Sequence, residues 1–116
     1  MCHVLIIEDE VLIAMHIEAM LESVGATSFA FAETEADAVK EARRRRPALI
    51  TSDVRLRHGT GPKAVELILS ELGHVPVIFI TGSPEESIPC DPPHRVLGKP
   101  LHEHSIASAF CEMAPV

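Results

Sequence analysis

Side chains suited to metal and phosphate chemistry follow four separate apolar runs of this 116-residue chain. Glu8 and Asp9 come directly after one run, and Asp53, Thr81 and Lys99 follow three others. If the runs are strands of one parallel sheet, these side chains meet beyond its carboxyl edge, where such sheets bind ligands. Carboxylates gather a hard divalent cation, whereas a lysine and a threonine hold phosphoryl oxygens. The pattern therefore predicts a site for a metal ion and a phosphoryl group.

Each residue also has an ordinary structural explanation when it is considered alone. Asp53 can start a turn, Lys99 can be a surface lysine, and the acids of residues 8–10 can favour the first turn of a helix. The functional interpretation is favoured because all of them fall at strand ends, in the order that one shared site requires. A carboxylate at this edge can attack phosphorus and form an aspartyl phosphate, so Asp53 is the predicted nucleophile.

The other predicted roles follow from charge. Thr81 is expected to donate to one phosphoryl oxygen, and Lys99 to attract another or to pair with Asp53 when phosphate is absent. The expected cofactor is Mg²⁺, because carboxylates gathered at one edge repel one another and a divalent cation relieves that repulsion. The predicted metal ligands are Glu8, Asp9, Asp53 and the backbone carbonyl of Arg55.

Apolar periodicity predicts an alternation of strands and helices along the chain. Residues 4–7 form a continuous apolar run, as expected for a strand buried on both faces. Residues 10–24 change to the period of a helix with one apolar face, which Gly25 suits as a stop. Thr34 and Asp37 resemble a capping box. The further strands are predicted at residues 27–32, 48–53, 75–80 and 96–97, and the further helices at 34–45, 62–72 and 100–113.

The stretch between Thr81 and Lys99 has an unusual composition for a connection between two parallel strands. A helix is expected there, yet prolines occupy positions 84, 89, 92 and 93. Proline inside a helix costs about 3 kcal/mol, because it lacks an amide donor and clashes with the preceding turn. We therefore expect a short or irregular fourth helix, and we expect a bound phosphoryl group to reorder residues 82–95.

Composition indicates one acidic domain. The net charge of -7 argues against nucleic acid as a partner, and the basic run at residues 43–46 falls at a predicted helix end, where cations are favoured. The sequence contains no apolar stretch long enough for a membrane span and no signal-peptide pattern. Three cysteines without paired spacing fit a reducing compartment, so a cytoplasmic location is expected. The seven histidines, from His3 to His104, are scattered and are expected to be solvated rather than to bind zinc.

The chain resembles the receiver domain of two-component response regulators across essentially its full length. The resemblance rests on residues 4–9 (VLIIED), 50–53 (ITSD), 79–82 (FITG) and 98–100 (GKP). It implies an α/β, flavodoxin-like, doubly wound sheet of five parallel strands in the order 2-1-3-4-5, with helices on both faces. It also implies that residues 1–116 form one receiver domain with no output domain.

The resemblance implies a role for each site residue. Asp53 is the implied phosphoacceptor, Glu8 and Asp9 the metal-side acids, Thr81 the switch hydroxyl and Lys99 the phosphate-binding lysine. The implied donor is a histidine kinase or a histidine phosphotransfer protein, and the implied output is a change of protein contacts or a phosphate-sink role. Such a domain is a signalling switch that catalyses its own phosphorylation and dephosphorylation, not an enzyme in the ordinary sense.

The chain departs from the usual receiver pattern in two places: at Val96, and at residues 56–61 (LRHGTG), which replace the usual Met-Pro and Asp-Gly after the acceptor. Val96 stands where the family usually has an aromatic switch residue. Residues 76–82 (PVIFITG) are nonetheless similar to the motif of the stand-alone "FAT GUY" receivers, which also tend to lack that aromatic residue. Arg55 is long and charged, so its side chain can hydrogen-bond the phosphoryl group, shield it from water, or pair with Glu8 in the metal-free state.

Two other functions compete with the phosphorylation switch. The main alternative is a receiver-like interaction module that no longer uses phosphate. The complete set of acids and the lysine argue against it, whereas Val96 and the proline-rich stretch argue mildly for it. A flavodoxin-like cofactor binder would need a Gly-, Ser- or Thr-rich turn after the first strand, but acids occupy residues 8–10 and repel phosphate.

Overall fold

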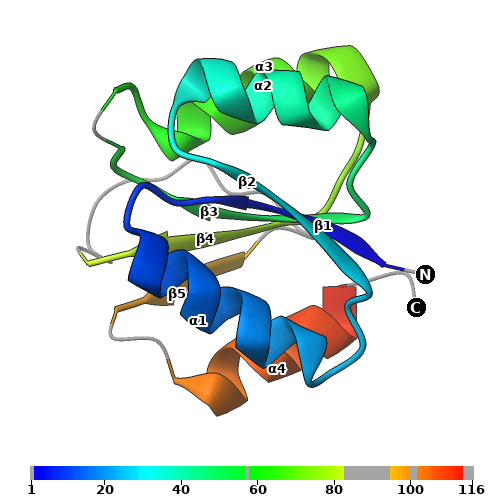
Figure 1. Cartoon of the computed structure of the whole chain (residues 1–116), viewed down its shortest axis with the longest axis vertical. Helices are drawn as coiled ribbons and strands as arrows, with labels where there is room; N and C mark the ends of the chain where they lie inside the picture. Colours follow the sequence, from blue (N-terminus) through cyan, green and yellow to red (C-terminus); the bar gives the residue numbers. More distant parts are fainter. Residues whose placement is uncertain (1, 57, 83–94, 100–101, 114–116) are drawn as a thin grey trace.

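The fold is a parallel sheet covered by helices on both faces. A computed structural model describes residues 2–56, 58–82, 95–99 and 102–113 (Figure 1). The strands are β1 (His3–Ile7), β2 (Ser28–Ala32), β3 (Leu49–Asp53), β4 (Val77–Thr81) and β5 (Arg95–Gly98). The helices are α1 (Val11–Glu22), α2 (Glu35–Arg44), α3 (Gly61–Leu72) and α4 (Glu103–Met113).

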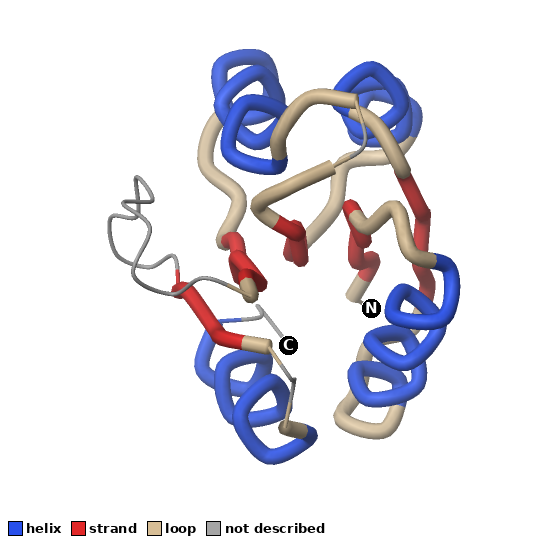
Figure 2. The backbone as a smooth tube through the Cα atoms, turned by 90° about the vertical axis from the view of Figure 1, so that its left-hand side faces the viewer, coloured by secondary structure: helices blue, strands red, loops and turns tan. Residues whose placement is uncertain are grey.

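The sheet has the predicted topology. Its order is β2-β1-β3-β4-β5 and every neighbouring pair is parallel. Helices α2 and α3 cover one face and α1 and α4 the other, which is clear in Figure 2, a view onto the carboxyl edge of the sheet. Each face has its own apolar cluster, and this confirms the doubly wound α/β fold.

Burial on both faces explains the apolar character of the inner strands, which is strongest in β1 and β4. Every residue of β1, β3 and β4 is buried, because these strands lie inside the sheet and are covered on both faces. Strand β2 lies at one edge of the sheet and is only half-buried. The rigid centre therefore carries the ends of β1, β3 and β4, where three of the chemical signals lie.

The predicted helix signals act where they were expected. The side chain of Thr34 accepts a hydrogen bond from the Asp37 amide and caps α2. Gly25 has a φ of 119°, which only glycine adopts readily, and it follows the end of α1. Strand β4 begins at Val77, two residues later than predicted, because Pro76 has no amide to donate to the sheet.

Two predictions from the sequence lie outside the described residues. The short fourth helix and the reordering segment fall almost wholly on residues 83–94, which are not described. The last predicted helix begins at Glu103 within the described part, later than residue 100. Among the described residues, no helix combines the length and the apolar character needed to cross a lipid bilayer.

The prediction that the histidines are solvated is wrong for His3. Its side chain is buried in β1, with an exposed fraction of 8%, and its Nδ1 lies 2.8 Å from the Ser28 hydroxyl. The basic run lies at the end of α2, as predicted, and Arg44 of this run lies near Glu41 of the same helix. Arg43 pairs with Glu71 of α3, and Arg46 donates to the carbonyl of His74 at 3.0 Å.

Candidate functional site

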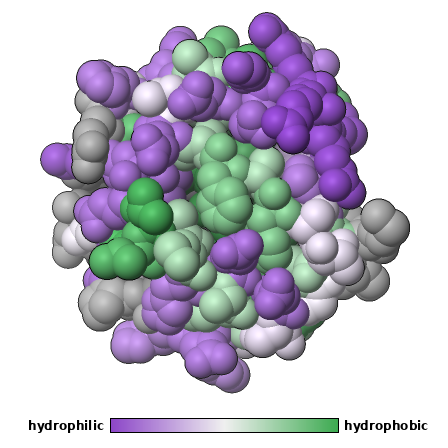
Figure 3. Space-filling model, viewed as in Figure 1, coloured by the Kyte–Doolittle hydropathy of each residue, from purple (hydrophilic) through white to green (hydrophobic). Residues whose placement is uncertain are grey.

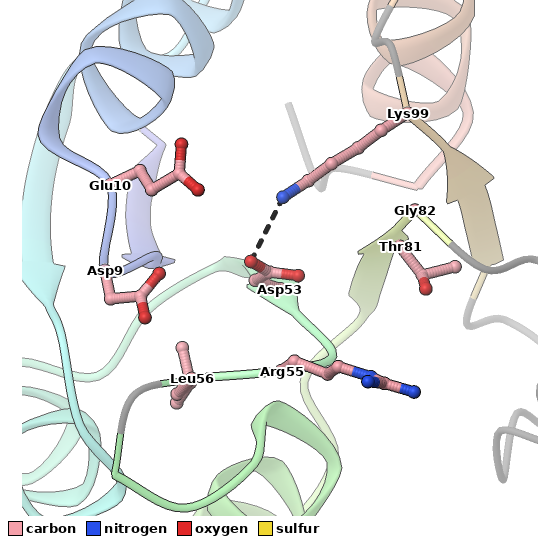
Figure 4. A pocket seen from close by; sticks show the side chains of 8 residues that line it. All are labelled: Asp9, Glu10, Asp53, Arg55, Leu56, Thr81, Gly82 and Lys99. Atoms are coloured by element: carbon pink, nitrogen blue, oxygen red, sulfur yellow. Dashed lines mark hydrogen bonds and ion pairs between the residues drawn. The ribbon is translucent and has the colours of Figure 1, made fainter.

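A cavity of about 420 Å³ lies at the carboxyl edge of the sheet. It holds the side chains that the strand ends were predicted to bring together (Figure 4). Asp53 ends β3 and Thr81 ends β4, and Lys99 follows β5 directly. The residues that line the cavity are Asp9, Glu10, Asp53, Arg55, Leu56, Thr81, Gly82 and Lys99.

Asp53 lies in the middle of this group. Figure 4 shows Asp9 and Glu10 on one side of its carboxylate and Thr81 on the other, with Lys99 reaching in from β5. Asp53 is 7% exposed and Thr81 is 3% exposed, so both are held by the buried centre of the sheet. A group bound to Asp53 would therefore meet acids on one side and a hydroxyl on the other.

Three carboxylates form a cluster that suits a divalent cation. Glu8, Asp9 and Asp53 each offer an oxygen, and these oxygens lie within 4.8 Å of one another. Glu8 is 3% exposed, and its Oε1 accepts no hydrogen bond from the described residues. Hard oxygen ligands, excess negative charge and an unsatisfied buried acceptor fit Mg²⁺. The predicted contribution of the Arg55 carbonyl stays a prediction.

Lys99 supplies the positive charge of the site. Its Nζ donates to Asp53 Oδ2 at 3.1 Å and lies 3.7 Å from Glu8 Oε1. Burial alone would lower the pKa of Lys99, but the hydrogen bond to Asp53 and the nearby charge of Glu8 outweigh it, so this pKa is raised. The ammonium is therefore fully charged at neutral pH. The Lys99 amide also donates to the Thr81 carbonyl at 2.8 Å, which joins the ends of β4 and β5.

Glu8 has a strongly shifted carboxyl group. Burial, followed by the negative charge of Asp53, raises the pKa of Glu8 to about 7. The amide of Glu10 donates to Glu8 Oε2 at 3.2 Å and, like Lys99, favours the charged form. Burial and repulsion dominate nonetheless, so without a cation the proton of Glu8 is lost only near neutral pH.

This shift predicts how stability depends on pH. Between pH 4.5 and about 7, folded Glu8 keeps a proton that the unfolded chain releases. Raising the pH through this window therefore favours unfolding, by about 3 kcal/mol in total for this group. Urea unfolding at several pH values, with a chelator present, measures the free energy of unfolding. It should fall with rising pH in the wild type and not in Glu8→Gln, apart from changes common to both proteins. Parallel pH profiles for the two proteins would contradict the shift.

The side chain of Arg55 is not paired with Glu8. Figure 4 shows its guanidinium directed away from Asp53, and the ion-pair partner of Glu8 is Lys99 instead. Of the three roles considered for Arg55, pairing with Glu8 is therefore not seen in this structure. The two roles toward a phosphoryl group remain predictions.

Contacts that the sequence analysis missed hold the loop after Asp53. The Thr60 amide donates to Glu35 Oε2 of α2 at 2.7 Å, and the Thr60 side chain caps α3. Arg55 and Thr60 form an isolated antiparallel bridge. The Gly61 amide donates to the Val54 carbonyl at 3.0 Å, which brings the start of α3 against the end of β3. The only signals in the sequence were the glycine beside Pro62 and an acid in the first turn of α2.

The fold and the site together define a known class of protein. The family model described as "Response regulator receiver domain" matches residues 4–90. The chain therefore belongs to the receiver-domain family, as the sequence resemblance implied.

Its relatives include proteins called PhyR. The chain is 38% identical over 113 residues to the "Phyllosphere-induced regulator PhyR" of Methylorubrum extorquens, covering 94% of this chain and 42% of that protein. It therefore spans less than half the length of the curated relative that it matches. The structure is also similar to the receiver domain of Erythrobacter litoralis PhyR, with a TM-score of 0.85, 34% identity and coverage of 97% and 88% of the two chains. The anti-anti-sigma factor PhyR of Bartonella quintana gives a TM-score of 0.74 and 38% identity over 96% of this chain and 49% of that one.

Proposed function

We propose that this receiver domain accepts a phosphoryl group on Asp53 in a Mg²⁺-dependent reaction and thereby switches its protein contacts. The supporting observation is the position of the Asp53 carboxylate, which lies between Lys99 and two further acids at the rim of a cavity. A carboxylate in this position is exposed enough to be reached and buried enough to be held in one orientation.

The proposed transfer needs little covalent chemistry from the protein. A carboxylate oxygen of Asp53 attacks phosphorus of a phosphohistidine, an oxygen–phosphorus bond forms, and the phosphorus–nitrogen bond breaks. The electron pair goes to the imidazole nitrogen of the donor, which then takes up a proton from water. The ammonium of Lys99 exchanges its bond to Asp53 for a phosphoryl oxygen, and the Thr81 hydroxyl donates to another. Water attack on the same phosphorus reverses the state, so the domain also catalyses its own dephosphorylation.

The metal would be held by Glu8, Asp9 and Asp53, with the Arg55 carbonyl as a further ligand. When bound, Mg²⁺ supplies positive charge that offsets the repulsion between these acids and the incoming phosphoryl oxygens. Glu8 must lose its raised-pKa proton before it can act as a full ligand.

The proposed donor is a histidine kinase or a histidine phosphotransfer protein, and the proposed output is a protein–protein contact. One relative is described as an anti-anti-sigma factor. The proposed partner of this chain is therefore an anti-sigma factor. The alternative, an interaction module that does not use phosphate, makes the opposite prediction in the experiment below.

Incubation with acetyl phosphate tests the proposal directly. Wild-type protein should gain the mass of one phosphoryl group when Mg²⁺ is present and not when it is chelated. Asp9→Asn should weaken Mg²⁺ binding at least about tenfold, because it removes one charged ligand. Asp37→Asn is the matched control, since it makes the same change at an exposed position of α2, outside the cavity and the cluster of three acids. Intact mass spectrometry and Mg²⁺ titration measure the two effects.

Two results would count against the phosphorylation switch. A wild-type protein that gains no mass with Mg²⁺ and acetyl phosphate, and none from a phosphorylated histidine phosphotransfer protein, would favour the phosphate-independent module. Equal Mg²⁺ affinity in Asp9→Asn and wild type would show that these acids do not hold the metal.

A further inference from the structure

A second cavity, of about 350 Å³, lies away from the phosphoacceptor site. It opens at the outer edge of β2, beneath the end of α2. His3 lines it at the start of β1, whereas Asp9 of the phosphoacceptor site follows the other end of that strand. We call this region the β2 cavity; its main lining residues are His3, Phe29, Phe31, Glu41, Arg44 and Arg45.

The wall of the β2 cavity is a strand edge with an apolar surface. Among the described strands, β2 has a neighbour on one side only. Phe31 is 45% exposed, and Phe29 is half-buried beside it. Figure 3 shows hydrophobic surface in the middle of this face, over β2, and strongly hydrophilic surface over the C-terminal end of α2. An unpaired strand edge of this kind is a template on which an extended segment can add as a new strand.

The rim of the β2 cavity is basic although the chain as a whole is acidic. Arg44 and Arg45 are exposed and line the cavity. Glu41 is the acid in the lining, and its Oε1 lies 3.6 Å from Arg44 Nη1. Arg43 and Arg46 belong to the same run, but they contact α3 and the residues that follow it. Two guanidinium groups against one carboxylate leave a net positive rim on a chain whose net charge is -7. Charge complementarity therefore favours an acidic occupant.

His3 adds a polar group to the inner wall. Its Nδ1 is engaged by Ser28, but its Nε2 is sealed from water and has no hydrogen-bond partner among the described residues. Burial and the nearby charge of Arg45 lower the pKa of His3, so the ring is neutral at physiological pH. Buried polar atoms without partners are rare in folded proteins. The neutral ring adds no charge to the cavity, so Arg44 and Arg45 set the sign of its rim.

We propose that the β2 cavity binds an extended acidic segment of a partner protein. The segment adds along the free edge of β2, places an apolar side chain against Phe29 and Phe31, and sets carboxylates against Arg44 and Arg45. The surface is separate from Asp53, so this binding goes beyond the proposed phosphoryl switch and does not require phosphorylation.

Selection from a phage library of random ten-residue peptides tests the proposal. The wild-type protein should enrich peptides in which acidic and apolar residues alternate. A synthetic copy of an enriched peptide should shift the amide resonances of residues 28–32 and of the end of α2. Its affinity should fall about tenfold in Arg45→Glu, through loss and reversal of one charge contact. Lys63→Glu, the same change on α3, should leave the affinity unchanged. Phe31→Ser tests the apolar contact independently of charge.

Three results would overturn the proposal. One is a selection that enriches no peptide. Another is enrichment of peptides whose affinity is the same for wild type, Arg45→Glu and Phe31→Ser. The third is self-association of the wild-type chain in sedimentation that Phe31→Ser abolishes, because a second copy would then be the occupant of this edge. The same preparation of wild-type protein should also be tested for phosphorylation. If it takes up a phosphoryl group normally, any of these three results contradicts the peptide-binding proposal and not the proposed function.

Discussion

Asp53→Asn is expected to abolish phosphorylation of this receiver domain. An amide is a poor nucleophile toward phosphorus. Without the carboxylate, the attack on phosphorus is therefore expected to be abolished and not merely slowed. The substitution keeps the shape of the side chain. In the wild type, Lys99 Nζ lies 3.1 Å from Asp53 Oδ2, and the amide oxygen of the variant can still accept this hydrogen bond. Intact mass spectrometry with acetyl phosphate and Mg²⁺ should show no added phosphoryl group under conditions that modify the wild type.

Asp37→Asn provides the matched control for this experiment. Asp37 is exposed in the first turn of α2, and the substitution makes the same chemical change away from the cavity. It should be phosphorylated like wild type. A phosphoryl mass on Asp53→Asn would show that another acid of the cluster is the acceptor.

The same variant has a second, independent readout. The negative charge of Asp53 contributes to the raised pKa of Glu8, so its removal should lower that pKa. The loss of stability between pH 4.5 and about 7 in the metal-free protein should therefore shrink in Asp53→Asn. This result would confirm that the two carboxylates face each other in solution, whatever the fate of the phosphoryl group.

The strand ends were predictable because one physical rule places them. Central strands of a parallel sheet are buried on both faces, so β1 and β4 read as apolar runs and β3 begins with one. The charged or polar side chains at the carboxyl ends of these strands must then lie at one edge of the sheet. That reasoning located Asp53 and Thr81 without a structure, and the lysine after β5 completed the set.

The loop contacts were not predictable in the same way. The bond from the Thr60 amide to Glu35 joins residues 25 apart in sequence, and neither residue belongs to a periodic pattern. The burial of His3 also escaped prediction. It depends on the register that pairs His3 with Ser28 and on α2 covering that end of the sheet, whereas the sequence shows only an isolated histidine. Long-range pairings of polar groups leave little trace in local composition.

Gly61→Ala is expected to destabilise the fold and displace the phosphoacceptor. A Cβ at position 61 would lie 1.8 Å from the Asp53 carbonyl oxygen and 2.3 Å from Ser52 Oγ, both of which belong to the buried end of β3. Neither the backbone oxygen nor the buried hydroxyl can move aside cheaply, so the start of α3 must shift away. We expect a loss of about 3 kcal/mol in the free energy of unfolding, as for other overpacked core positions.

The displacement should also slow phosphorylation, because Asp53 is covalently part of the segment that must move. A misplacement of about 1 Å can cost about 100-fold in rate, so this effect should exceed that of destabilisation alone. Gly82→Ala is the control: Gly82 lines the same cavity, but a Cβ there meets nothing within 4 Å. Urea unfolding and phosphorylation rates should separate the two variants clearly. Equal stability of Gly61→Ala and Gly82→Ala would show that α3 does not pack closely against the end of β3. This contact could then not hold Asp53 in its orientation.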